Sequence, residues 1–263
     1  MENLKNTHYK IFREKSTTPP GSELIFFCIS DLHGNVYEPD NRPILELAKE
    51  AKPDLILASG DILSGEDSRT DEVAVSLLSR LLAVAPVCYV NGNHEIQLRK
   101  HEPKRYGRFI ERLENCGVQV LNNRSIQMEI KEQKVCVYGY ELPLEFYRRF
   151  NRKKPEVSAM KNAIGTPDKL AINILLTHNP MHFEEYAQWG ADVVFAGHLH
   201  GGFIRLPHFG GVISPQIHFF PKYDKGIFAL RQSVMVVSAG LGNHSGLFRI
   251  NNPTETVVLT MRE

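Results

Sequence analysis

Five short apolar runs constrain the fold of this chain more than any other feature of the sequence. They occupy residues 24–29, 54–58, 87–90, 171–176 and 192–196. Runs of this length are typical of strands buried on both faces, which belong to sheets covered by helices. The stretches 43–51, 71–82, 103–115 and 183–189 are predicted to supply those helices. The sequence therefore predicts an α/β fold.

The second half of the chain is richer in β structure. Residues 126–130 alternate with polar residues and 135–140 follow after a short turn, which predicts two consecutive strands. Three further runs, 227–230, 234–237 and 256–260, are expected to form a final antiparallel group. Because there is no internal repeat or low-complexity linker, we expect residues 1–263 to form one domain. It would be an α/β sandwich of two packed sheets with helices outside.

Composition and charge exclude several classes of protein. With 42% hydrophobic and 23% charged residues, the chain has the composition of a globular protein, not of a disordered one. Its net charge of +1 gives no general attraction for a polyanion, which argues against a dedicated nucleic-acid-binding protein.

Cysteine usage and the start of the chain bear on the compartment. The four cysteines, Cys28, Cys88, Cys116 and Cys136, form no CxxC pair, and we expect buried thiols in a reducing compartment. Residues 1–15 lack the apolar core of a signal peptide, and the run 24–29 is far too short to cross a bilayer. We therefore expect a cytoplasmic protein without a transmembrane segment, for which peripheral membrane contact stays open.

Polar side chains suited to metal binding or phosphate chemistry follow each of the five apolar runs. In chain order they are Asp31 and His33, Asp61, Asn93 and His94, His178, and His198 and His200. Functional groups gather at the carboxyl ends of strands in open α/β sheets, so we expect these side chains to converge.

The residue types suit two divalent transition-metal ions. Imidazole and carboxylate match Mn, Fe, Zn or Ni better than Ca or Mg. One carboxylate can bridge two cations, and metals about 3.5–4 Å apart stabilise the attacking and leaving oxygens of phosphoryl transfer. Taken singly, each motif has an ordinary explanation, such as a capped turn or a buried histidine. Their joint occurrence, in order and each at a strand end, indicates a metal site.

In this arrangement the sequence resembles the calcineurin-like metallophosphoesterase family. The family motifs are Asp-x-His, Gly-Asp, Gly-Asn-His-Asp/Glu, His and Gly-His-x-His, and all occur in order between Asp31 and His200. The resemblance implies a metallophosphoesterase-type β-sandwich flanked by helices, with four layers in the order α/β/β/α. It also implies two metal sites that share Asp61 as a bridge. The first would contain Asp31, His33, Asp61 and His200, and the second Asp61, Asn93, His178 and His198.

The resemblance also implies a role for the side chains nearest the substrate. His94 would not bind metal but would lie by the scissile phosphate, as electrostatic stabiliser or general acid. Asn93 would contact the substrate as well as a metal.

Some sequence features indicate which branch of the family the chain resembles. No arginine closely follows Gly60-Asp61, and residues 197–200 hold a doubled histidine, unlike the Ser/Thr protein phosphatases. Residues 197–202 and Gly240-Leu241-Gly242 look like bacterial phosphohydrolases of the UDP-2,3-diacylglucosamine pyrophosphatase-like group. This implies hydrolysis of a small or lipid-linked phosphate ester, at a phosphodiester or pyrophosphate bond, by attack of a metal-bound hydroxide.

Two alternative functions fit parts of the sequence. One is a metal-retaining binding or scaffold protein without turnover, against which the intact motifs and His94 argue. The other is a nuclease, whose only support is a basic cluster that is more typical of a solvated face. That cluster consists of Arg148, Arg149, Arg152, Lys153 and Lys154.

The loop 201–224 has two interpretations. Its large apolar residues either pack over the edge of the sandwich or form an apolar wall beside the metals. These residues are Phe203, Ile204, Phe209, Ile213, Ile217, Phe219 and Phe220. Three histidines of late loops, His208, His218 and His244, are expected to face solvent.

Overall fold

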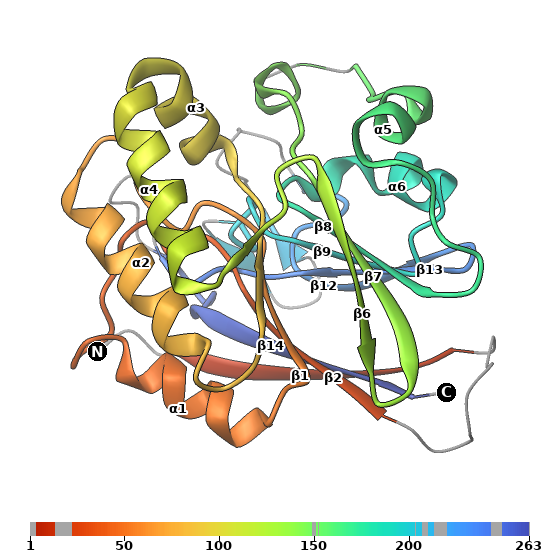
Figure 1. The fold of residues 1–263 in the computed structure, drawn as a ribbon, viewed down its shortest axis with the longest axis horizontal. Helices are drawn as coiled ribbons and strands as arrows, with labels where there is room; N and C mark the ends of the chain where they lie inside the picture. Colours follow the sequence, from red (N-terminus) through yellow and green to blue (C-terminus); the bar gives the residue numbers. More distant parts are fainter. Residues whose placement is uncertain are drawn as a thin grey trace.

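The computed structural model describes residues 4–13, 23–148, 151, 153–202, 204–206, 210–212, 220–242 and 249–262. Two six-stranded sheets form the centre of the molecule, and helices cover their outer faces (Figure 1). The expected α/β sandwich with outer helices is therefore confirmed.

The first sheet has the strand order β1-β14-β2-β3-β4-β5. Its strands are β1 (Lys5–Phe12), β14 (Glu255–Arg262), β2 (Glu23–Ile29), β3 (Leu55–Ala58), β4 (Val87–Tyr89) and β5 (Gln119–Val120). Strands β2 to β5 run parallel to one another, whereas β14 runs antiparallel to β2. The carboxyl ends of β2, β3 and β4 therefore open at the same edge.

The second sheet has the order β12-β13-β9-β8-β7-β6. Its strands are β12 (Gly226–Leu230), β13 (Ser233–Val237), β9 (Val193–Ala196), β8 (Ile172–Thr177), β7 (Gln133–Tyr140) and β6 (Arg124–Ile130). The four inner strands are parallel, and β12 and β6 pair antiparallel at the two edges. A separate small pair joins β10 (Arg205–Leu206) to β11 (Gly210–Gly211).

Helices divide between the two outer faces (Figure 1). On the side of the first sheet lie α1 (Arg42–Ala51), α2 (Arg69–Leu81), α3 (Asn93–His101) and α4 (Pro103–Cys116). On the side of the second lie α5 (Val157–Ile164) and α6 (Phe183–Trp189). Two short 3₁₀ turns, η1 (Leu144–Tyr147) and η2 (Pro180–His182), follow β7 and β8.

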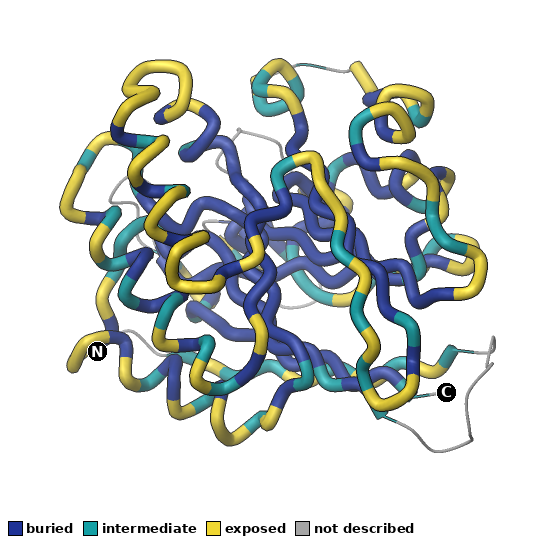
Figure 2. The backbone as a smooth tube through the Cα atoms, viewed as in Figure 1, coloured by how far each residue is buried: buried dark blue, intermediate teal, exposed yellow. Residues whose placement is uncertain are grey.

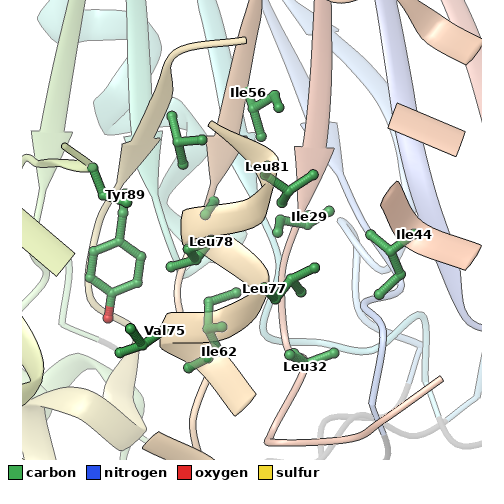
Figure 3. Packing of buried hydrophobic residues seen from close by; sticks show 14 of the residues in the cluster. Ile29, Leu32, Ile44, Ile56, Ile62, Val75, Leu77, Leu78, Leu81 and Tyr89 are labelled. Carbon is green, nitrogen blue, oxygen red and sulfur yellow. The ribbon is translucent and has the colours of Figure 1, made fainter. Parts of the chain in front are cut away.

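Three apolar layers fill the molecule: one between the two sheets, and one between each sheet and the helices that cover it. Successive side chains of a strand point alternately into the two layers on either side of its sheet. On β2, Phe27 and Ile29 pack toward the helices, while Phe26 and Cys28 pack between the sheets, as the two-residue period of a strand requires. Leu77 and Leu81 of α2 meet the first sheet in the outer layer (Figure 3). Buried residues run through the inner strands of both sheets, whereas exposed residues lie on the outer sides of the helices and on edge strands such as β6 (Figure 2). These packed layers hold the strand ends in place.

The structure corrects the sequence expectations at several points. Residues 256–260 do not join β12 and β13; they lie in β14, between β1 and β2 of the first sheet. Nearly all of β14 is buried, so it needs neighbours on both sides. Cys116 is exposed because it ends α4 on the solvent side, whereas Cys28, Cys88 and Cys136 are buried as expected. Strand β1 and helices α3 and α5 were not expected.

Candidate metal centre

The carboxyl ends of strands from both sheets meet at one site. Asp31 and His33 follow β2, Asp61 follows β3, and Asn93 and His94 begin α3 after β4; His178 follows β8, and His198 and His200 follow β9. In three groups the possible ligand atoms all lie within 4.8 Å of one another. The groups are Asp31 with His33 and His200, His33 with Asp61 and His94, and Asp61 with His178 and His198.

Asp61 lies at the centre of the site. Its Oδ2 is 3.0 Å from His178 Nε2 and 4.0 Å from both His33 Nε2 and His94 Nε2. Its Oδ1 accepts a hydrogen bond of 2.9 Å from the backbone N–H of His94. One oxygen of this carboxylate therefore faces imidazoles contributed by both sheets.

Asp31 lies beside the two histidines His33 and His200. Its Oδ1 is 3.4 Å from His200 Nε2 and 4.0 Å from His33 Nε2. Those two imidazole nitrogens are 3.2 Å apart, and their rings stack with an interplanar angle of 16°. Nitrogens this close and turned toward one carboxylate could hold a common cation.

The backbone of the site is strained. Five of the site residues have a positive φ, which is uncommon outside glycine. They are Asp31 at 49°, His33 at 50°, Asp61 at 53°, His198 at 71° and His200 at 50°. Such conformations cost energy and persist where the surrounding structure holds them, typically at functional sites.

Glycines allow the turns of the site to approach one another. A Cβ on Gly92 would lie 2.2 Å from Asp61 Oδ1, and a Cβ on Gly197 would lie 2.2 Å from Asp31 Oδ2. No side chain fits at either position, so these glycines let each loop backbone pass directly over a carboxylate.

A backbone carbonyl orients His178. Its Nδ1 lies 2.7 Å from the carbonyl oxygen of Ser59, which can only accept a hydrogen bond. Neutral His178 therefore carries its hydrogen on Nδ1 and leaves the lone pair of Nε2 directed at the carboxylates.

The two buried carboxylates repel each other and need positive charge. Burial favours a protonated Asp61, but His178, His94 and His33 outweigh it and hold the pKa of Asp61 well below its usual range. Burial raises the pKa of Asp31 to about 6, and the charge of Asp61 adds to that rise. Burial lowers the pKa of His178, but Asp61 and Asp31 outweigh it and raise the pKa to about 9. Without metal, the proton on His178 supplies positive charge beside the two carboxylates.

The residues present fit a metal ion. Among the residues that the structure describes, Asn93 Oδ1 is a buried acceptor with no hydrogen-bond partner. A buried oxygen normally has one, and coordination of a cation would satisfy it. The neighbouring donors are imidazole nitrogens and carboxylate oxygens, the ligands of first-row divalent metals.

Glu95 shapes the site, although the sequence analysis gave it no role. It is fully buried, and its carboxylate accepts from the backbone N–H groups of Asp61, Ile62, Leu63 and Gly92 at 2.8–3.2 Å. Its place three residues after Gly92 is the capping-box spacing, a signal that could have found it.

The described residues of the basic cluster do not contact the metal centre. Lys153 pairs with Glu145, and Lys154 with Glu184 and Glu185. Arg148 is exposed. Arg149 and Arg152 lie outside the described residues, as do Phe203, Phe209, Ile213, Ile217, Phe219, His208, His218 and His244.

The described part of the aromatic loop is partly exposed. Phe220 is 56% exposed and Ile204 is 37% exposed. Both residues are thus only partly covered by the rest of the protein. No helix within the described ranges is both long and apolar enough to cross a membrane.

Comparisons with known proteins agree with this geometry. A family model described as Calcineurin-like phosphoesterase matches residues 24–202. Phosphodiesterase YaeI of Escherichia coli (strain K12) is 26% identical over 235 residues, which cover 89% of this chain and 80% of that protein. UDP-2,3-diacylglucosamine pyrophosphatase LpxG of Chlamydia muridarum (strain MoPn / Nigg) is 27% identical over 153 residues, 56% of this chain and 42% of that protein.

One solved structure supports the fold. The phosphopantetheinyl hydrolase PptH from Mycobacterium tuberculosis superposes with a TM-score of 0.52 at 16% identity, over 84% of this chain and 91% of that one. At this identity the likeness concerns the fold alone.

Proposed function

Since this chain belongs to the calcineurin-like phosphoesterase family, as its motifs predicted, we propose that two divalent transition-metal ions bind between its sheets and share Asp61. The protein is a phosphoric ester hydrolase. The observation that carries the proposal is the position of Asp61 Oδ2, which is 3.0 Å from His178 Nε2 and 4.0 Å from His33 Nε2. An oxygen between histidines of both sheets suits a carboxylate that bridges two cations.

Each metal would have four protein ligands. Asp31, His33, Asp61 and His200 would hold one ion, and Asp61, Asn93, His178 and His198 the other. The buried Oδ1 of Asn93 supports its place in the second set. This mixture of imidazole, carboxylate and amide ligands suits Mn, Fe, Zn or Ni. When bound, two such ions supply Lewis acidity toward the phosphate and lower the pKa of a water between them.

We assign His94 to the substrate, not to a metal. The side chain of His94 is 17% exposed, whereas those of His33, His178 and His200 are 7%, 0% and 3% exposed. This greater exposure beside Asp61 supports the assignment, because His94 would then meet the phosphate and donate a hydrogen bond or a proton to the leaving oxygen. Asn93, the preceding residue, would contact the same phosphate.

The role of His94 is tested by leaving-group dependence. His94→Ala should retain its metals and lose activity by about 10²–10⁴-fold on alkyl phosphodiesters, the range that general acid catalysis contributes. It should lose less on nitrophenyl esters, because nitrophenolate leaves readily without a proton. Equal losses would indicate electrostatic stabilisation of the other phosphate oxygens. Loss of one metal would show that His94 is a ligand.

We propose a small or lipid-linked phosphate ester as substrate, cleaved at a phosphodiester or pyrophosphate bond. The names of the two relatives, a phosphodiesterase and a diacylglucosamine pyrophosphatase, support this class. An apolar surface also supports it, since Ile204, Leu206 and Phe220 are 37%, 44% and 56% exposed. Ile204 and Phe220 both bond to the backbone of Val212, so they are neighbours. This surface begins shortly after His200 and would favour an acyl chain or peripheral contact with a membrane.

An activity screen tests the proposed function. Metal-reconstituted protein would be assayed on monoesters, cyclic nucleotides, nucleoside diphosphate sugars and phospholipids, with Asp61→Asn as the inactive control. Turnover of a diester or pyrophosphate substrate supports the proposal. Two bound metals without turnover on any class would favour the scaffold alternative.

A further inference from the structure

An ion pair between Arg99 and Glu141 links the two sheets beside the metal centre. Glu141 directly follows β7, the neighbour of β8, and its side chain is 7% exposed. Arg99 belongs to α3, the helix that begins with Asn93 and His94. The two Nη atoms of Arg99 donate to the two carboxylate oxygens of Glu141 at 3.0 and 2.5 Å. Such bidentate pairs fix relative orientation as well as distance.

The same carboxylate also holds the end of β4. Asn91 Nδ2 donates to Glu141 Oε2 at 2.7 Å and to the hydroxyl oxygen of Tyr106 at 2.8 Å, while Asn91 Oδ1 accepts from Tyr89 at 3.0 Å. The amide of this fully buried side chain is thus bonded at both ends, which leaves it one orientation. Asn91 immediately precedes Gly92 and Asn93, so Glu141 holds the strand end that delivers Asn93.

Arg99 and Asn91 meet again at Tyr106 on α4. The Arg99 guanidinium lies 5.6 Å from the centre of the Tyr106 ring, and the Tyr106 hydroxyl accepts from Asn91. Arg99 of α3 and Asn91, which follows β4, therefore both bind the carboxylate of Glu141, and Tyr106 of α4 contacts both of them. A network with every member bonded is rigid, because no single partner can turn without breaking a hydrogen bond.

The Arg99–Glu141 ion pair lies nearer to some metal ligands than to others, so its loss should affect the two metal sites unequally. Asn93 comes from the first sheet, whereas His178 and His198 come from β8 and β9 of the second. A cation held by all three would require the two sheets to keep their spacing at the β4 and β7 ends. His33, by contrast, follows β2, which is two strands away from β4.

We propose that Arg99 and Glu141 are positioning residues that set the spacing of Asn93 against His178 and His198, and so tune the affinity of that metal site selectively. This inference rests on the proposed function, because it presumes a metal at that position. Groups behind metal ligands typically change affinity or activity by about 10–100-fold when they are replaced.

The Arg99–Glu141 ion pair can be broken without leaving Glu141 as a buried charge shielded from water. A cavity of about 420 Å³, lined in part by Arg99, Lys100 and Glu141, lies against it. Removal of the Arg99 side chain would let water reach the carboxylate from this cavity, so Arg99→Ala should fold. Arg99→Lys keeps the charge but not the paired donors, since a lysine is a point charge on a flexible stem.

A matched control exists at the far end of the sheets. Lys131 pairs with Asp54 at 2.7 Å, with side chains 47% and 14% exposed, comparable to 42% and 7% for Arg99 and Glu141. Asp54 lies just before β3, at the amino end, whereas the metal ligands follow the carboxyl ends. Lys131→Ala removes a similar ion pair without touching the metal centre.

The experiment is a titration of metal-free protein with Mn²⁺ or Co²⁺, followed by calorimetry and, for Co²⁺, by absorption. Wild type should show two binding steps; failure to do so would count against the proposed function itself. Arg99→Ala should weaken one step by about 10–100-fold, the step that His198→Ala abolishes, and leave the His33-dependent step unchanged. Arg99→Lys should recover part of the loss, and Lys131→Ala should change neither step. With two wild-type steps established, equal weakening of both in Arg99→Ala, or no change in either, would overturn the inference.

Discussion

Replacement of Glu95 by glutamine should destabilise the protein by about 2–6 kcal/mol. Each carboxylate oxygen of Glu95 accepts two backbone N–H groups: Oε1 those of Ile62 and Leu63, and Oε2 those of Asp61 and Gly92. Glutamine keeps one acceptor oxygen and places an NH₂ where the other was. Two buried N–H donors then lose their acceptor, at about 1–3 kcal/mol each.

The assay is urea unfolding of metal-free protein at pH 8.5. Burial, and next the charge of Asp61, raise the pKa of Glu95 to about 7, so the wild-type carboxyl is ionised at that pH. Glutamine avoids the cost of burying that charge, so we expect the loss to lie at the lower end of the range. The control is Glu72→Gln, since Glu72 is 70% exposed where it pairs with Arg112. That change should alter the free energy of unfolding by less than about 0.5 kcal/mol.

The metal content of the same variant provides a second measurement. Both carboxylate oxygens accept from the backbone at or directly beside Asp61, so loss of either one in Glu95→Gln should also lower occupancy of both metals. A free energy of unfolding within about 1 kcal/mol of wild type would refute the reasoning, because it would mean that the two N–H groups left by the lost oxygen find other acceptors.

Three further predictions follow from the site. Asp61→Asn should lower the content of both metals, because a neutral amide bridges two cations poorly; full double occupancy by elemental analysis would contradict the bridge. Metal affinity should rise about tenfold per pH unit between about pH 6 and pH 9 and then level off. In that range the metal must displace the one proton that Asp61 and Asp31 hold on His178, whereas Asp31 is itself protonated below about pH 6. Titrations in buffers across this range would show a flat profile if the reasoning is wrong. Phe220→Ser should raise KM for a lipid-linked ester but not for a minimal aryl phosphodiester; equal changes on both, or lost thermal stability, would favour a packing role.

Strand patterns were predictable where burial is uniform and failed where it is not. Residues 24–29 are apolar throughout and 171–176 are apolar except for Asn173, and both form strands within a residue of the expected bounds. β1 alternates between exposed and partly buried residues at the edge of its sheet, and its polar sequence gave little strand signal. Helix α3 has few apolar residues because its first turn serves the site, so helical periodicity could not reveal it.

The sequence by itself determined which chemistry gathers at the strand ends. Asp31, His33, Asp61, His178, His198 and His200 each follow an apolar strand, and parallel strands must end at a common edge. It could not determine which sheet each strand joins, because the pairing of apolar strands depends on tertiary packing and not on their local sequence. Strand β14, for example, lies in the first sheet and not beside β12 and β13. Only the tertiary structure placed Glu95 under Asp61, and Glu141 against Arg99 and Asn91. Those contacts join residues far apart in the chain. The carboxylates become buried, and so need these partners, only when the two sheets pack together around one site.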